Sequence, residues 1–279
     1  MDLPGALYVP TTADGFEATE FAATEFQATE FQATALTIGP WDPAFQHAGP
    51  PAALLARAAE RASGIEGGQT VRLAYDILGP VPVGPMRIST EVLRPGRRIE
   101  LLEAVLSGAD DRPLMRLTAW RMRVRDDGAT PVDAPPVPVP AGPEQSRPES
   151  AAFFTQEIAY HRALDWRFAA GSFNAPGPAA AWTRPQCTLV EGEPMSPLEH
   201  LLVMTDAASG ISAALDWQAA TFANVDLTVA LHRPPRGEWL GMDARTVLGD
   251  SGAAQAFAVL FDAEGAIGRS AQSLFVEAR

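Results

Sequence analysis

Two parts of the chain show the same order of hydrophobic patterns, in which a helix-like stretch precedes long runs with strand-like alternation. In the first part, Gly-Pro-Pro at 49–51 opens a predicted helix, with prolines at positions that helix starts tolerate. Apolar residues recur at helical spacing and form one face of this helix: Leu54, Leu55, Ala58, Ala59 and Ala62. In the second part, Ser-Pro-Leu-Glu at 196–199 is a capping box, and it predicts a helix running to about Leu215.

Strand-like runs rich in Val, Leu and Thr follow each predicted helix. Between the two parts, residues 131–148 are rich in proline and are typical of an extended linker. Identical residues recur 154 positions apart on its two sides: Val71 and Val225, Pro80 and Pro234, Val105 and Val259. This shared spacing indicates an internal repeat. We therefore expect an α+β fold of two fused repeats, each with a central helix wrapped by a curved antiparallel sheet. The predicted repeats span residues 1–127 and 151–279, with the linker at 128–150.

The sequence Ala-Thr-Glu-Phe recurs within residues 16–37 with a period of five residues. An odd period would turn successive phenylalanines to opposite faces of a strand, and it forms no single stripe on a helix either. We interpret the segment as a tandem duplication within an N-terminal strand or its flanking loop. One copy would form the strand, and the extra copies would lie at the surface.

Composition narrows the classes of function. The net charge of −13 argues against a nucleic-acid partner, which needs a basic face. All 21 basic residues are arginine, which excludes Schiff-base chemistry and a lysine general base. No apolar run approaches the length of a membrane span, and the N-terminus lacks the pattern of a signal peptide. Cys187 is the single cysteine, so an internal disulfide is impossible and a cytoplasmic location is expected.

Several common reaction centres are missing from the sequence. It contains no Gly-x-Ser-x-Gly motif, no phosphate-binding glycine loop and no paired-histidine metal motif. The four histidines are scattered: His47, His161, His200 and His232. We therefore expect neither a metal nor another cofactor.

Asp206 is the one charged residue between His200 and Leu215, in a helix otherwise predicted from apolar, small or uncharged residues. A carboxylate buried there is costly unless it is hydrogen-bonded, and it would be a candidate general base. A solvated helix face or a structural hydrogen bond to the backbone would explain the same residue equally well.

Other polar positions are compatible with a site near this helix. Three of them alternate along the next predicted strand and would share one face: Asn224, Asp226 and Thr228. They could hold a water, although such a set is also typical of the solvent side of a sheet. Gln272 is open to the same two interpretations. His47 and Gly49 lie at the start of the first helix, whose free N–H groups could stabilise an oxyanion.

Three segments resemble the thioesterase II (medium-chain acyl-CoA thioesterase) family. Residues 45–57, with His-Ala-Gly-Pro-Pro at 47–51, resemble its helix start. Residues 224–234 resemble its second-half motif, Asp-x-Ser/Thr followed by His-Arg-Pro, and Ala-Gln-Ser at 271–273 resembles its terminal strand. The resemblance covers nearly the whole chain after about Ile38. Ala48, where the family usually has glycine, and the repeated Ala-Thr-Glu-Phe segment depart from the family pattern.

The resemblance implies a double hotdog fold and hydrolysis of acyl-CoA by a water that Asp, Ser/Thr and Gln orient together. In this sequence these roles fall on Asp206, Thr228 and Gln272. Asp206 would take a proton from the water, and N–H groups around Gly49 would receive the oxyanion. The CoA phosphates would need arginines, with Arg94, Arg97, Arg98, Arg233 and Arg236 as candidates. Hotdog proteins pair their sheets, so the two halves would pair first, and a homodimer or higher oligomer is compatible with the fold.

Two other functions remain open at this point. A hotdog hydratase or dehydratase acting on acyl-CoA could use Asp42 and His47 as an acid–base pair, but the Asp/Thr/Gln set would then have no role. A non-catalytic acyl-binding protein would keep the fold without turnover, and the presence of Asp206 argues against it.

Overall fold

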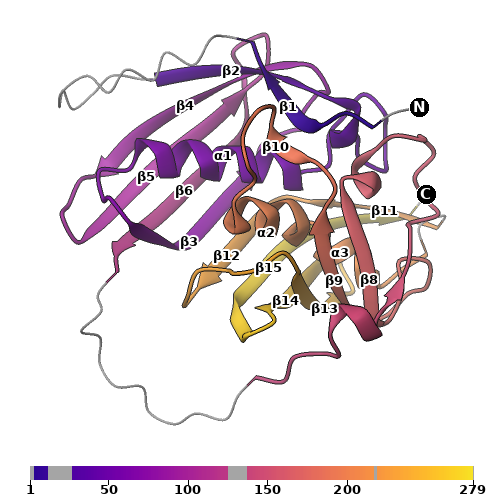
Figure 1. Cartoon of the computed structure of the whole chain (residues 1–279). Helices are drawn as coiled ribbons and strands as arrows, with labels where there is room; N and C mark the ends of the chain where they lie inside the picture. The colour runs from indigo at the N-terminus through magenta and orange to yellow at the C-terminus, as the bar shows by residue number, and fades with distance from the viewer. Residues whose placement is uncertain (1–2, 12–26, 125–136, 217–218, 279) are drawn as a thin grey trace.

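The computed structural model describes residues 3–11, 27–124, 137–216 and 219–278, which build one continuous curved sheet around central helices (Figure 1). In the first half, helix α1 (Gly49–Ala62) lies against strands in the order β1-β2-β4-β5-β6-β3. These strands are β1 (Ala6–Pro10), β2 (Gln27–Ala33), β3 (Gly68–Ile77), β4 (Pro85–Arg94), β5 (Ile99–Ser107) and β6 (Pro113–Arg123). A 3₁₀ turn, η1 (Ala35–Thr37), follows β2.

The second half contains helices α2 (Pro197–Thr205) and α3 (Ala208–Ile211) and the 3₁₀ turns η2 (Pro143–Gln145) and η3 (Tyr160–Arg162). Its strands are β7 (Arg147–Pro148), β8 (Leu164–Ala170), β9 (Ala179–Pro185), β10 (Thr188–Val190), β11 (Ala220–Asn224), β12 (Asp226–Leu231), β13 (Leu240–Leu248), β14 (Ala253–Asp262) and β15 (Gly265–Ala278). They follow the order β12-β15-β14-β13-β9-β8-β7, with β11 also paired to β15.

Two strand pairs join the halves. β3 and β12 run antiparallel at the centre of the sheet, with Asp76 opposite Asp226 and Arg72 opposite Ala230. At the far edge, β10 from the second half pairs in parallel with β1 of the first. The chain is therefore closed into one body by backbone hydrogen bonds as well as by its core.

The order β4-β5-β6-β3 in the first half recurs as β13-β14-β15-β12 in the second. The register of β3 against β6 shifts between Thr70 and Arg72, on either side of Val71. A matching irregularity lies at Val225, the residue between β11 and β12. This agreement confirms the internal repeat. The exact boundaries at 127 and 150 stay a prediction, and the end of the expected linker contains η2 and the short edge strand β7.

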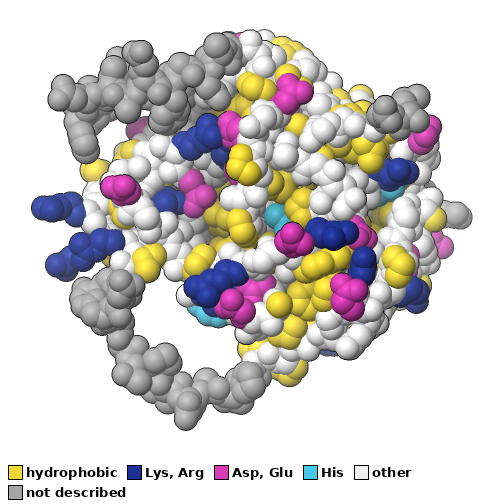
Figure 2. All heavy atoms as spheres, in the orientation of Figure 1, with side chains coloured by type: hydrophobic (Ala, Val, Ile, Leu, Met, Phe, Trp, Pro, Cys, Tyr) yellow, Lys and Arg dark blue, Asp and Glu magenta, His cyan; other side chains and the backbone are white. Residues whose placement is uncertain are grey.

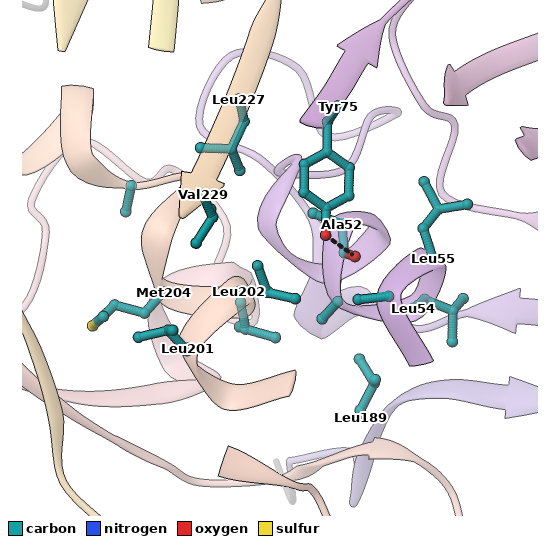
Figure 3. Close-up of a cluster of buried hydrophobic side chains, with 14 of the residues drawn as sticks. Ala52, Leu54, Leu55, Tyr75, Leu189, Leu201, Leu202, Met204, Leu227 and Val229 are labelled. Carbon is teal, nitrogen blue, oxygen red and sulfur yellow. Dashed lines mark hydrogen bonds between the residues drawn. The ribbon is translucent and has the colours of Figure 1, made fainter. Parts of the chain in front are cut away.

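The core lies between the two helices and the sheet (Figure 3). Leucines of α1 and α2 face one another there and meet the inner face of β12, and all of the following are fully buried: Leu54, Leu55, Leu201, Leu202, Leu227 and Val229. The hydroxyl of Tyr75 donates to the carbonyl of Ala52 at 3.0 Å, so β3 is also tied to α1.

Gly49 allows the start of α1 to touch the last turn of α2. A Cβ at this position would lie 2.3 Å from the carbonyl oxygen of Val203, closer than atoms can approach. Only glycine fits there without moving the helices apart.

The second helix is shorter than its sequence pattern predicts. α2 ends at Thr205, and a separate short helix, α3, begins at Ala208. The predicted continuous helix to about Leu215 is therefore wrong. The hydroxyl of Thr205 donates back to the carbonyl of Leu201 at 2.5 Å, and Ser and Gly residues follow, which together weaken a helix.

One copy of the repeated Ala-Thr-Glu-Phe sequence, 28–31, lies in β2, and its Phe31 is buried. The copies at 18–21 and 23–26 lie outside the described residues. Among the described residues, no helix has the length and apolar character that crossing a membrane requires. On the face shown in Figure 2, arginines lie beside acidic side chains. Arg61, for example, forms an ion pair with Glu193 at 2.7 Å.

Candidate active site

Asp206 lies where the two halves meet, directly after α2 and beside the start of α1. Its side chain is 5% exposed, which rules out the solvated helix face that the sequence left open. Because α2 ends at Thr205, the carboxylate leaves the helix axis and turns towards β11 and β15.

The Asp206 carboxylate is held by groups from three different elements. Its Oδ1 accepts hydrogen bonds from the side-chain amides of Asn224, at 2.7 Å, and Gln272, at 3.2 Å. Its Oδ2 lies 3.1 Å from Nδ1 of His47. The Gln272 amide also donates to the backbone carbonyl of Asp206 at 3.0 Å. These contacts compensate the burial of the carboxylate.

His47 is fixed by its backbone and by an aromatic neighbour. The backbone N–H of His47 donates to the carbonyl of Thr37 at 2.7 Å. The imidazole ring stacks on Tyr160, with the ring centroids 3.7 Å apart and the planes 5° from parallel. Tyr160 is itself anchored by a 2.8 Å hydrogen bond from its hydroxyl to Val203. Burial lowers the pKa of His47, and the nearby Asp206 carboxylate opposes this shift.

Gln272 carries a buried polar atom that needs a further partner. Its side chain is 1% exposed, and its Oε1 makes no hydrogen bond to any residue in the part of the chain that the structure describes. A buried acceptor without a partner is costly, so this oxygen marks a place for a water or a substrate group beside Asp206.

Gly49 is placed at the site, but the first turn of α1 offers few donors. Pro50 and Pro51 have no N–H, and the Gly49 N–H lies 3.2 Å from Nδ1 of His47. The expectation of several free N–H groups at this helix start is therefore corrected, because the residues that make the helix start also remove its donors.

Thr228 is not brought to this group. It lies opposite Ala271 on β15, on the outer face of the sheet, whereas Asn224 lies opposite Leu274 on the inner face. One extra residue, Val225, enters the strand between them and forms a bulge, which turns Asn224 and Thr228 to opposite faces. The expectation that they share one face is wrong.

Asn224 occupies the place expected for Thr228, and sequence reasoning missed this. The alternation along residues 224–228 could not reveal the bulge. A signal existed in the internal repeat, since Val71, 154 positions before Val225, occupies the matching irregularity in β3. Asp226 instead accepts from the N–H of Ser273 at 2.5 Å, close to the bulge.

The opposite end of the helix pair holds a related cluster with different chemistry. Glu60, in the last turn of α1, accepts a hydrogen bond from Thr70 at 2.8 Å. Thr70 lies 154 positions before Asn224. The same oxygen of Glu60 contacts the guanidinium of Arg121, and Arg121 is 6% exposed. A permanent positive charge therefore occupies this counterpart of the Asp206 site.

An apolar pocket lies close to Asn224. Ser209 of α3 donates to the Asn224 side-chain oxygen at 3.3 Å and also lines this pocket. The other lining residues come mainly from the following turn and from β11, β13, β14 and β15, and include Ala213, Leu215, Phe222, Leu248, Leu274 and Val276. Trp41 packs edge-to-face on Phe222, with centroids 5.2 Å apart.

Other candidate residues have different roles in the structure. Asp42 accepts from the backbone N–H of Ala44 at 2.8 Å, so the acid–base pair considered for a hydratase is not formed. Arg233 is held by Asp262 through two hydrogen bonds of 2.6 Å. Burial raises the pKa of Cys187 to about 12, which makes a thiolate nucleophile unavailable at neutral pH. The described residues contain no cluster of His, Cys, Asp and Glu that could hold a metal.

Two family models match consecutive parts of the chain and together cover most of it. Residues 37–122 match the acyl-CoA thioesterase N-terminal domain, and residues 131–276 match the acyl-CoA thioesterase C-terminal domain. The chain belongs to the acyl-CoA thioesterase family. Thioester hydrolysis is therefore its reaction class, and the resemblance to thioesterase II is confirmed. No curated protein matches the chain.

Solved structures of similar proteins confirm the double hotdog fold of this acyl-CoA thioesterase. A putative thioesterase II from Thermobifida fusca has a TM-score of 0.73 at 20% identity, covering 94% of this chain and 96% of that one. A hot dog fold protein of unknown function from Alicyclobacillus acidocaldarius has a TM-score of 0.70 at 17% identity, covering 92% and 97%. An acyl-CoA thioesterase II, TesB2, from Mycobacterium marinum has a TM-score of 0.66 at 15% identity, covering 91% and 96%.

Proposed function

We propose that this thioesterase hydrolyses acyl-CoA to the free acid and CoA with a water activated at Asp206. The observation that carries this proposal is a buried carboxylate held by two side-chain amides and a histidine at the junction of the two halves. An ionised group in such a place is expensive to maintain, and it is typical of a reaction centre.

Gln272 supplies the position of the water in this proposal. Its unpaired Oε1 accepts a hydrogen bond from the water next to the Asp206 carboxylate. Asn224 and Gln272 hold the carboxylate in place. Thr228, on the other face of the sheet, has no part in this scheme.

The acyl chain would bind along the apolar residues beside Asn224, which must move apart to admit it because the space they enclose is only about 10 Å³. The walls of this space carry no charged side chain among the described residues, and Ser209 links them to the carboxylate cluster through Asn224. An acyl chain lying there places its thioester carbonyl towards Asp206. The burial of each methylene contributes about 0.8 kcal/mol to binding.

The cytoplasmic location and the further self-association stay predictions.

The test is the release of CoA from a panel of short- to long-chain acyl-CoAs by the wild type and by Asp206→Asn. We expect hydrolysis by the wild type and a loss of about 10²- to 10⁴-fold in kcat in the variant. His232→Gln, at an exposed position at the start of a turn, is the matched control and should retain activity. The absence of CoA release with every acyl chain would refute the proposal.

A further inference from the structure

We propose that Ser270 holds the attacking water together with Gln272. The inference rests on the proposed function, because it completes the water site of the same hydrolysis. It starts from two buried oxygen atoms. Among the described residues, the only buried side-chain oxygens without a hydrogen-bond partner are Oγ of Ser270 and Oε1 of Gln272.

These two oxygens come from side chains on the same face of β15. Ser270 and Gln272 are two residues apart and both buried, whereas Arg269 is exposed on the outer face. Two residues of a strand span about 6.6 Å, and one water that is hydrogen-bonded on both sides spans about 5.5 Å. A single water molecule therefore has the right size to bridge the two groups.

Small apolar side chains flank both groups on the neighbouring strand. In β14, Ala258 lies opposite Ser270 and Ala256 lies opposite Gln272. Both alanines are buried, and α3 packs on the same strand. A methyl group takes up little space and forms no hydrogen bond. The two oxygens therefore depend on a molecule that enters the site, since a buried polar group without a partner is costly.

Buried hydroxyls at the two short helices of the second half are satisfied by the backbone. Thr205 donates to the carbonyl of Leu201 at 2.5 Å, and Ser212 donates to the carbonyl of Ala208 at 2.7 Å. A hydroxyl on a helix reaches the carbonyl four residues earlier. Ser270 lies in the middle of a strand that is paired on both sides, so the ladder uses the nearby carbonyls. Its hydroxyl therefore stays available for a ligand.

The Ser270 hydroxyl supplies a group that the rest of the site lacks. Thr228 lies on the outer face of the sheet, and the amide of Asn224 occupies its expected place. The water donates one proton to Gln272 and the other to Asp206, and it accepts the proton of Ser270. Three of its four hydrogen-bonding positions are then filled. The remaining lone pair has a fixed direction and is free to attack the thioester carbon.

Ser270 keeps its own proton throughout the reaction. As the water oxygen forms its bond to the thioester carbon, one water proton moves to Asp206 and the other stays on the attacking oxygen. The carbon–sulfur bond then breaks, and the proton on Asp206 moves to the CoA sulfur. Ser270 therefore acts by orienting the water, so its removal should affect kcat rather than substrate binding.

The first test compares the wild type, Ser270→Ala and Asp206→Asn on the best acyl-CoA substrate. We expect Ser270→Ala to lower kcat by about 10- to 10²-fold and to leave KM within a few-fold. Removing an unpaired buried hydroxyl also removes its desolvation cost, so the midpoint of urea unfolding should stay the same or rise.

Ser146→Ala is the matched control for this substitution. Ser146 is also buried, but its hydroxyl donates to the carbonyl of Gly142 at 2.9 Å, next to the edge strand β7. The control should keep the wild-type kcat and unfold at an equal or lower concentration of urea, because it loses a hydrogen bond.

A folded Ser270→Ala variant with the wild-type kcat, beside an inactive Asp206→Asn, would overturn the role of Ser270 and leave the proposed function intact. A lower kcat together with a lower urea midpoint would also overturn it, because both would then follow from a structural role.

A second measurement is independent of turnover. In a crystal structure of the wild type, we expect an ordered water within about 3.2 Å of both Ser270 Oγ and Gln272 Oε1. This water should be lost or displaced in Ser270→Ala. If the wild type held no water there, the proposal would be refuted even if no acyl-CoA were hydrolysed.

Discussion

The contact between Gly49 and Val203 allows a sharp prediction about the Gly49→Ala variant. The new Cβ would lie 2.3 Å from the Val203 carbonyl oxygen, and an ordinary contact needs at least 3.4 Å. The helices must therefore separate by about 1 Å, and overpacking of this kind costs about 1–3 kcal/mol. The same movement carries His47 away from Asp206, and a misplacement of about 1 Å at a site can cost about 10²-fold in rate.

Urea unfolding and CoA release measure the two effects of Gly49→Ala separately. Gly142→Ala is the matched control, because its Cβ would meet no atom within 4 Å and its φ of −61° suits alanine. We expect the control to keep wild-type activity and to be equally or slightly more stable. If Gly49→Ala matched the control in both measurements, the contact would not hold the site together, and the reasoning would fail.

Two further predictions concern the pocket and the stability at low pH. Ala213→Leu adds side-chain volume to the apolar region beside Asn224, which must open to admit an acyl chain, and it should shift the preferred substrate to shorter chains by about fourfold in affinity per lost methylene. The exposed Ala253→Leu should not change the acyl-CoA profile. For Asp262, burial opposes ionisation, but the hydrogen bonds and charge of Arg233, together with the backbone N–H groups of Glu264 and Arg236, outweigh it and lower the pKa from 3.8. The pair therefore stabilises the fold above pH 3.8 and loses this effect as the pH falls below it. The free energy of unfolding measured in urea should fall more steeply with acid in the wild type than in Asp262→Asn.

Local patterns in the sequence were enough to predict the repeat and the start of both central helices, and they singled out Asp206 without deciding whether it is buried. These features follow from hydrophobic spacing and capping residues, which act over a few positions. The end of α2 at Thr205 was not predicted, because the apolar composition continues past the break.

The partners of Asp206 were only partly predictable. One bulge residue, Val225, reverses the face on which Asn224 lies, and no alternation count reveals an inserted residue. The contact of His47 with Asp206 joins residues from different halves of the chain. Such a contact depends on how the helices cross, which is set by Gly49 and Val203 together rather than by either segment.

The cluster of Glu60, Thr70 and Arg121 shows what fusion of two repeats makes possible. In a homodimer of single repeats, symmetry would impose the same residues on both helix junctions, so an arginine that fills one would fill the other. Covalent fusion removes this constraint, and each junction can mutate independently. In this chain one junction holds the buried carboxylate cluster of Asp206, and the other holds the ion pair of Glu60 and Arg121, an asymmetry that two identical repeats could not have.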